Sequence, residues 1–179
     1  MGRSGGICFS VRFLMREAYK VEETIRRIGQ KALTFRFPAV MGGRMTYLVP
    51  EEFRGRWLVL SFVPGLGERE SRLWNRQGKV LAELGAVLLL VPSEMRALYW
   101  KRLSGIGPLH FAVAGDPLKR LQRLYGGAAE LSVGRARTFL VDPEGTLRFH
   151  LMHTLTTQGM DVLKELLCAH QDAEFAASA

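Results

Sequence analysis

The sequence predicts an α/β domain in which a central mixed sheet is flanked by helices. Two nearly continuous apolar runs, at residues 57–63 and 86–91, are typical of strands that are buried on both faces. The pattern between them is helical, so the three elements form a parallel, right-handed crossover. Two later β-rich runs flank the turn residues 142–145 (Asp-Pro-Glu-Gly), which predicts an antiparallel hairpin near the end of the chain.

The first 30 residues predict a leader followed by an amphipathic helix. Apolar residues recur at alternating steps of four and three, charged residues occupy the other face, and Gly29 is a natural helix end. The apolar residues of this stripe are Leu14, Ala18, Val21, Ile25 and Ile28. The spacing leaves two alternatives open: the stripe packs on the chain's own core, or it pairs with the same helix of a second copy.

The remaining elements follow in order along the chain. Short apolar pieces broken by Pro38, Gly42 and Gly43 predict a hairpin-like segment within residues 31–50. We expect helices at residues 72–84, 94–103, 118–125 and 158–170, and a strand at residues 109–114. The chain then divides into an N-terminal part (1–30), one domain (31–171) and a frayed tail (172–179). This order of elements is that of a thioredoxin-type arrangement.

Composition and charge exclude several classes of protein. Of 179 residues, 47% are hydrophobic, and the two cysteines, Cys8 and Cys168, are too few for a disulfide framework or a cysteine-based zinc site. The net charge is +8, but the 19 Arg residues are scattered, so nucleic acid is not the expected partner. The longest apolar run, residues 84–92, is about half the length that crosses a bilayer. With no signal peptide expected either, we predict a cytoplasmic protein without a membrane partner.

Several short motifs together carry a resemblance to a known family. They are Phe53-Arg-Gly-Arg-Trp57, Phe62-Val-Pro64, Leu84-Gly-Ala86, Ala97-Leu-Tyr-Trp100, Gly115-Asp-Pro117, Leu124-Tyr-Gly126 and Thr138-Phe-Leu-Val-Asp-Pro-Glu-Gly145. By their order and spacing, the chain resembles the peroxiredoxins of the alkyl hydroperoxide reductase and thiol-specific antioxidant group from about Ala32 to Gln171. The resemblance implies a thioredoxin-like fold of peroxiredoxin type, thiol-dependent peroxidase chemistry and association into homodimers or larger homo-oligomers. We expect no cofactor.

The resemblance also places the family's active site on this chain. The family's Pro-x-x-x-Thr-x-x-Cys loop begins at Pro64, which puts Glu68 at the Thr position and Ser71 at the position of the peroxidatic Cys. The family's Arg, six residues before the hairpin Asp, falls on Ala136. Of these four signature positions, only Pro64 keeps the family's residue.

Two arginines, Arg135 and Arg137, flank Ala136 in the sequence. Successive residues of a strand point to opposite faces, so both guanidinium groups are expected to aim away from the pocket unless a bulge intervenes. The family's chemistry needs a thiolate, which a serine hydroxyl cannot supply. A carboxylate from Glu68 beside that position would also oppose an anion.

These departures predict a protein without thiol peroxidase activity that acts as an interaction or regulatory protein. Two alternatives stay open. The chain is a peroxide-reducing antioxidant protein that uses Cys8 or Cys168, or it is an engineered Cys-to-Ser form of an active enzyme. The context of Cys168 favours a small packing residue over a reactive thiol.

The remaining candidate residues favour structural roles. Gly65, Gly67 and the following helix start favour an anion, but Glu68 and Glu70 would repel one. Ser71 is expected to cap the helix.

The two histidines near the C-terminus, His150 and His153, are three apart on a predicted strand and therefore on opposite faces, which argues against a shared metal ion. If the protein forms oligomers, the candidate contact residues are Phe62, Leu66, Trp74 and Trp100.

Overall fold

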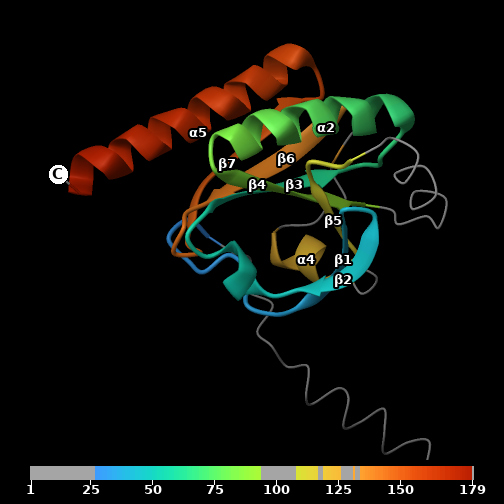
Figure 1. Cartoon of the computed structure of the whole chain (residues 1–179), viewed down its shortest axis with the longest axis horizontal. Coiled ribbons are helices and arrows are strands. Elements are labelled where there is room, and N and C mark those ends of the chain that lie inside the picture. Colours follow the sequence, from blue (N-terminus) through green and yellow to red (C-terminus); the bar gives the residue numbers. More distant parts are fainter. Residues whose placement is uncertain (1–26, 94–107, 117–118, 126–130, 132–133, 179) are drawn as a thin grey trace, which may run out of the picture.

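The computed structural model describes residues 27–93, 108–116, 119–125, 131 and 134–178 (Figure 1). The predicted helix at residues 94–103, nearly all of the predicted N-terminal helix, Cys8 and Trp100 lie outside these residues. Within the described ranges, none of the helices combines the length and the apolar character that crossing a membrane requires.

A mixed sheet forms the centre of the described structure. Its strand order is β2-β1-β5-β4-β3-β6-β7. The strands are β1 (Phe37–Met41), β2 (Arg44–Leu48), β3 (Trp57–Val63), β4 (Ala86–Pro92), β5 (Ala112–Ala114), β6 (Arg135–Val141) and β7 (Leu147–Thr154). The pairs β3–β4 and β4–β5 are parallel, and the other neighbours are antiparallel. All seven residues of β3 are buried, so the predicted strand with two covered faces is confirmed.

Helices cover both faces of this sheet (Figure 1). The long helices α2 (Glu68–Glu83) and α5 (Thr157–Ser178) lie together on one face, and the short helices η1 (Pro50–Phe53) and α4 (Arg120–Leu124) pack on the other. Side-chain amides join the two long helices: Gln77 donates to the carbonyl of Met160 at 3.0 Å, and Gln171 donates to that of Leu84 at 2.8 Å. The predicted βαβ crossover is therefore present, and α5 reinforces the layer that α2 forms.

Two antiparallel hairpins confirm the predicted turns. Gly42 and Gly43, both with positive φ, join β1 to β2, which is the pattern of a type I′ turn. The second hairpin joins β6 to β7 through Asp142–Gly145, and its register shifts between Leu140 and Val141. This shift is a β-bulge, and it leaves Arg148 as the extra residue on β7.

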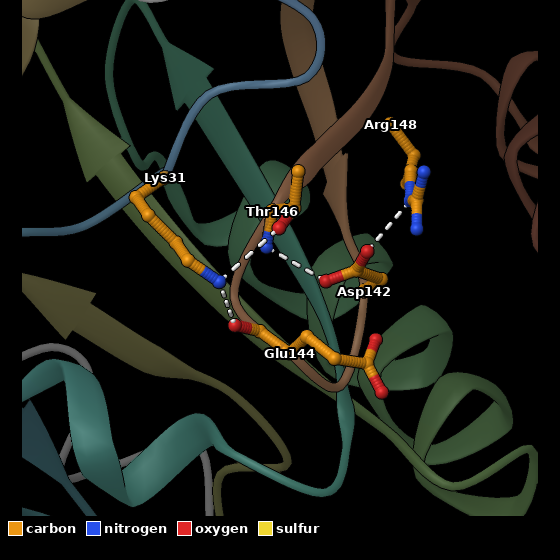
Figure 2. A network of polar contacts seen from close by, with 5 residues as sticks. All are labelled: Lys31, Asp142, Glu144, Thr146 and Arg148. Atoms are coloured by element: carbon orange, nitrogen blue, oxygen red, sulfur yellow. Dashed lines mark hydrogen bonds and ion pairs between the residues drawn. The ribbon is translucent and has the colours of Figure 1, made fainter.

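A network of polar contacts holds the β6–β7 turn (Figure 2). The buried Asp142 carboxylate accepts the backbone N–H of Thr146 at 2.7 Å and the Nε–H of Arg148 at 2.6 Å. From outside the hairpin, Lys31 donates to the carbonyl of Glu144 at 2.7 Å and to the hydroxyl of Thr146 at 3.3 Å. The network therefore fastens the start of the domain to a turn more than a hundred residues away in sequence.

Several element ends differ from the sequence prediction. Helix α2 begins at Glu68 rather than at residue 72, because Glu68 and Glu70 supply favourable charge to its first turn. Strand β5 covers only residues 112–114, and the backbone just before it, at Pro108 and His110, is hydrogen-bonded to the Asn75 side chain of α2. Helix α5 continues through Ser178, past the predicted end at residue 170, so most of the tail predicted to fray is helical.

Candidate active site

Ser71 lies in the first turn of α2 with its side chain turned toward the sheet. Only 2% of the residue is exposed, and it shares the buried stripe of the helix with Trp74, Gln77 and Leu81. Its backbone N–H donates to the carbonyl of Gly67 at 2.9 Å. The N-cap of α2 is Gly67, which has extended backbone geometry, so the predicted capping role of Ser71 is wrong.

The carboxylates of Glu68 and Glu70, both in this first turn, point in different directions. Glu68 is exposed and forms an ion pair with Arg72 at 2.6 Å on the solvent side of the helix. The expectation that its charge acts on the Ser71 position is therefore wrong, since Arg72 offsets it in solvent. The Glu70 carboxylate folds back over Gly67, where it would meet a Cβ directly. An acid thus already lies against the backbone of the helix N-terminus, where an anion is favoured.

Strand β6 places Ala136 and its two neighbours on opposite faces of the sheet. Ala136 is fully buried and packs in the same cluster as Trp74 and Val63, on the side that α2 covers. The half-buried Arg137 donates to the carbonyl of Tyr125 at 3.4 Å on the other side, and Arg135, two residues away along the strand, is exposed. The bulge on this hairpin lies beyond Leu140, so the pairing is regular at all three residues.

Three buried polar side chains form a row on the face of the sheet that α2 covers, one on each of the neighbouring strands β3, β6 and β7. The Ser61 hydroxyl lies 2.7 Å from the Thr138 hydroxyl, which lies 2.9 Å from Nε2 of His153. The Nδ1 of His153 lies 3.2 Å from the carbonyl of Thr154, which can only accept, so Nδ1 carries the proton when the ring is neutral. Nε2 must then accept from Thr138, and Thr138 in turn accepts from Ser61. The contacts define a one-way chain of donors from Ser61 to the imidazole.

Burial favours the neutral form of His153, and the direction of the donor chain matches that form. Burial lowers the pKa of His153 from its ordinary value of 6.5, against a smaller opposing effect of its bond to the Thr154 carbonyl. Protonation at Nε2 would force Thr138 to accept from the imidazole and so reverse the chain. The ring also meets Trp74 edge to face, with 6.1 Å between ring centroids.

We therefore expect acid to destabilise the fold through His153. Its folded pKa lies below its unfolded value, so the unfolded chain binds the extra proton first, and stability falls as pH drops below about 6.5. Denaturant unfolding at a series of pH values measures this slope. His153→Gln should flatten it, whereas His150→Gln should leave it in place, because His150 is exposed. An unchanged slope in His153→Gln would contradict the assignment.

The Ser61–Thr138–His153 chain is the part of the region that the sequence prediction missed. One signal was available, because Ser61 is the single polar residue in the run of residues 57–63. A buried hydroxyl needs a hydrogen-bond partner, so that residue alone called for a polar neighbour on an adjacent strand. The register that brings Thr138 opposite Ser61 could not be read from either segment by itself.

The other predicted residues are placed as follows. Pro64, Gly65 and Gly67 form a partly buried loop between β3 and α2, and Cys168 is half-buried on α5. His150 and His153 do lie on opposite faces: His150 is exposed and stacks on Phe139, while His153 contacts Trp74. In the described ranges, no three His, Cys, Asp or Glu side chains gather as a metal site would require.

The proposed oligomer contacts need a correction. Phe62, Leu66 and Trp74 are all at most 2% exposed. They belong to the core and cannot meet a partner surface, since the continuous apolar character of this region reflects burial by α2 and α4.

The fold and the site together define a thioredoxin-like α/β protein of peroxiredoxin type. Its structure is similar to AhpC of Enterococcus faecalis, with a TM-score of 0.68, 20% identity and coverage of 82% of this chain and 93% of that one. It is also similar to AhpC of Mycobacterium tuberculosis, with a TM-score of 0.67, 21% identity and coverage of 86% and 98%. At these identities the likenesses show the fold.

Comparison of sequences gives the family. The chain is 31% identical over 132 residues to peroxiredoxin TSA1-B of Candida albicans, covering 68% of this chain and 67% of the relative. It is 27% identical over 160 residues to a putative peroxiredoxin in the rubredoxin operon of Clostridium pasteurianum, covering 82% and 90%. No family model matches the sequence. The chain belongs to the peroxiredoxin family.

Proposed function

We propose that this peroxiredoxin-family protein has no thiol peroxidase activity and acts as an interaction or regulatory protein. The observation that carries the proposal is Ser71, which stands where the family's motif has its nucleophilic cysteine. A serine hydroxyl does not ionise near neutral pH and has no sulfenic acid chemistry, so it cannot complete a peroxidase cycle. The protein then keeps the scaffold of the family without its reaction.

The surroundings of Ser71 support the same proposal. Ser71 is almost fully buried, and the position at which the family's motif has its Arg holds Ala136, which packs in the same cluster as Trp74. Both neighbouring arginines are directed elsewhere, Arg137 toward Tyr125 and Arg135 toward solvent. At the helix N-terminus, Glu70 already covers Gly67. The carboxylate at this place and the missing guanidinium at residue 136 both disfavour the negative charge that develops when a peroxide bond is cleaved.

A peroxide consumption assay tests the proposal. Purified protein, supplied with hydrogen peroxide and with thioredoxin or dithiothreitol, should consume peroxide no faster than buffer. Ser71→Cys alone should gain little, because Glu68 supplies no hydroxyl at the Thr position and Ala136 supplies no guanidinium at the Arg position. Ser71→Ala is the matched control for the substitution itself. Consumption well above buffer that is lost on alkylation would overturn the proposal and point to Cys8 or Cys168. Strong rescue by Ser71→Cys alone would overturn it in favour of an inactivated enzyme.

We further propose that the protein is cytoplasmic and works as a homodimer or larger homo-oligomer, or beside an active relative. Family membership supports association, and the excess of positive charge favours a partner with an acidic surface. Nucleic acid is a poor fit, since binding through scattered arginines would be weak and steeply dependent on salt.

A further inference from the structure

One side of helix α2 packs on the sheet, and the other side faces outward and carries basic side chains (Figure 1). Four exposed cations recur at steps of three, four and three, so they lie on one side of the helix. We call them the α2 basic stripe: Arg69, Arg72, Arg76 and Lys79. The stripe is about 15 Å long. Between Glu70 and Glu83, the sequence of α2 contains no acid.

The stability of α2 itself does not explain the α2 basic stripe. Its neighbouring members are three or four residues apart, and like charges at this spacing repel each other. Cations are favoured in the last turn of a helix, but the last turn of α2 holds Glu83 and no base. Glu68 offsets part of the positive charge through its ion pair with Arg72. Among the described residues, no acid forms an ion pair with Arg69 or Arg76.

The stripe surrounds an open hollow near the start of α2. Its volume is about 420 Å³, and its lining residues all belong to this helix: Glu68, Arg69, Arg72 and Arg76. A volume of this size lies within the range of pockets that hold small molecules, so the hollow has room for side chains of a partner. Guanidinium groups bind carboxylates through paired hydrogen bonds, which gives such a contact a defined geometry.

We propose that the α2 basic stripe binds an acidic, amphipathic helix of a partner protein. Carboxylates on that helix recur at the same steps of three and four, so that each meets one cation of the stripe. Leu73 and Val80, which are half-buried, lie beside the stripe, and the apolar side chains of the partner helix pack there. The proposal rests on the interaction role proposed above and names the class of partner. It uses the outer side of α2, whereas Ser71 lies on the inner side.

The distribution of charge on α2 disfavours other occupants. Glu68 and Glu83 lie at the two ends of the stripe, and they would repel a nucleic acid backbone, which is negative along its whole length. A second copy of α2 would bring cations against cations. A partner helix can instead place acids opposite the stripe and neutral or basic residues opposite the two glutamates, and this pattern provides specificity.

Two synthetic peptides test the binding. The probe is an Ala-based helical peptide of about 20 residues, with four Glu spaced by three, four and three and two Leu beside them. In the control peptide, all four Glu are replaced by Gln. In fluorescence anisotropy at low ionic strength, the full-length chain should bind the Glu peptide about tenfold more tightly than the Gln peptide, and added salt should weaken binding. Equal binding of the two peptides, or binding of neither, would overturn the proposal.

Charge variants of the protein test the surface. Arg72→Glu/Arg76→Glu should weaken binding of the Glu peptide about tenfold or more. The matched control, Arg44→Glu/Arg54→Glu, changes the net charge equally at exposed arginines outside α2, and its effect should be much smaller. Glu68→Gln removes the competing carboxylate from Arg72 and should strengthen binding about two- to fivefold.

Two results with these variants would contradict the proposal. Equal losses in the two double variants would show an attraction that depends on net charge alone. Tighter binding of a DNA duplex than of the Glu peptide would show that the stripe recognises phosphates instead. Circular dichroism of each variant confirms that it is folded. The readout is a binding constant, so a failure here leaves the proposed lack of peroxidase activity to its own assay.

Discussion

Replacing Asp142 by Ala is expected to cost about 3 kcal/mol of the free energy of unfolding. The buried carboxylate accepts one backbone N–H and one guanidinium N–H, and both bonds are charge-assisted. Its loss leaves the Thr146 N–H without a partner in the turn, and releases the bulged Arg148 from its position. Urea denaturation followed by circular dichroism measures the change.

Glu144 in the same turn supplies the control for Asp142. It is exposed, and Lys31 contacts its backbone carbonyl rather than its carboxylate. Glu144→Gln should therefore change stability by no more than about 0.5 kcal/mol. Equal losses in the two variants would show that the turn depends on its net charge and not on the two bonds of Asp142.

Replacing Trp74 by Ala should have the larger effect, a loss of about 3–5 kcal/mol. The side chain is fully buried between α2 and the sheet, against His153 and the cluster that contains Ala136. Its indole Nε1 is the buried side-chain nitrogen for which the described residues offer no hydrogen-bond partner. Burial of an unpaired N–H is unfavourable, so part of what the ring contributes is offset by its own polar group.

Trp74→Phe separates these two contributions. It keeps an aromatic ring in the cluster and removes the unpaired N–H, so the loss should be less than half of that in Trp74→Ala. Calorimetry or denaturant unfolding of both variants gives the comparison. Losses of similar size would contradict this account and would mean that the N–H is paired in solution.

The sequence predicted secondary structure well where a short segment is apolar throughout or carries typical turn residues. The runs at residues 57–63 and 86–91 and the turn at residues 142–145 all predicted the observed elements, because apolar strands and turn residues act over a few positions. The alternation of side chains along β6 correctly predicted that Arg135 and Arg137 lie on the opposite face of the sheet from Ala136. Element ends were less predictable, since they depend on distant contacts such as that of Asn75 with Pro108.

The candidate site was only partly predictable for the same reason. Ser71, Glu68 and Ala136 were identified by their positions in motifs, but the direction of each side chain depends on tertiary packing. Glu68 turned out to pair with Arg72, and Ser71 to lie inside the helix rather than at its cap. Burial keeps His153 neutral and its contacts with Thr138 and Thr154 fix its tautomer, and both conditions exist only once β6 and β7 are in register.

Relatives of this protein are often recognised by short motifs, and the two arginines beside Ala136 show how closeness in sequence can mislead such a comparison. Along the chain, an arginine lies one residue to either side of Ala136. In the folded sheet, both arginine side chains lie on the face opposite to that of Ala136. A motif search that tolerates an offset of one position would accept Arg135 or Arg137 as the family's Arg, and so would any count of arginines within a short window. For strand residues, the odd or even spacing from a fixed neighbour indicates better than nearness in sequence whether a side chain lies on a given face of the sheet.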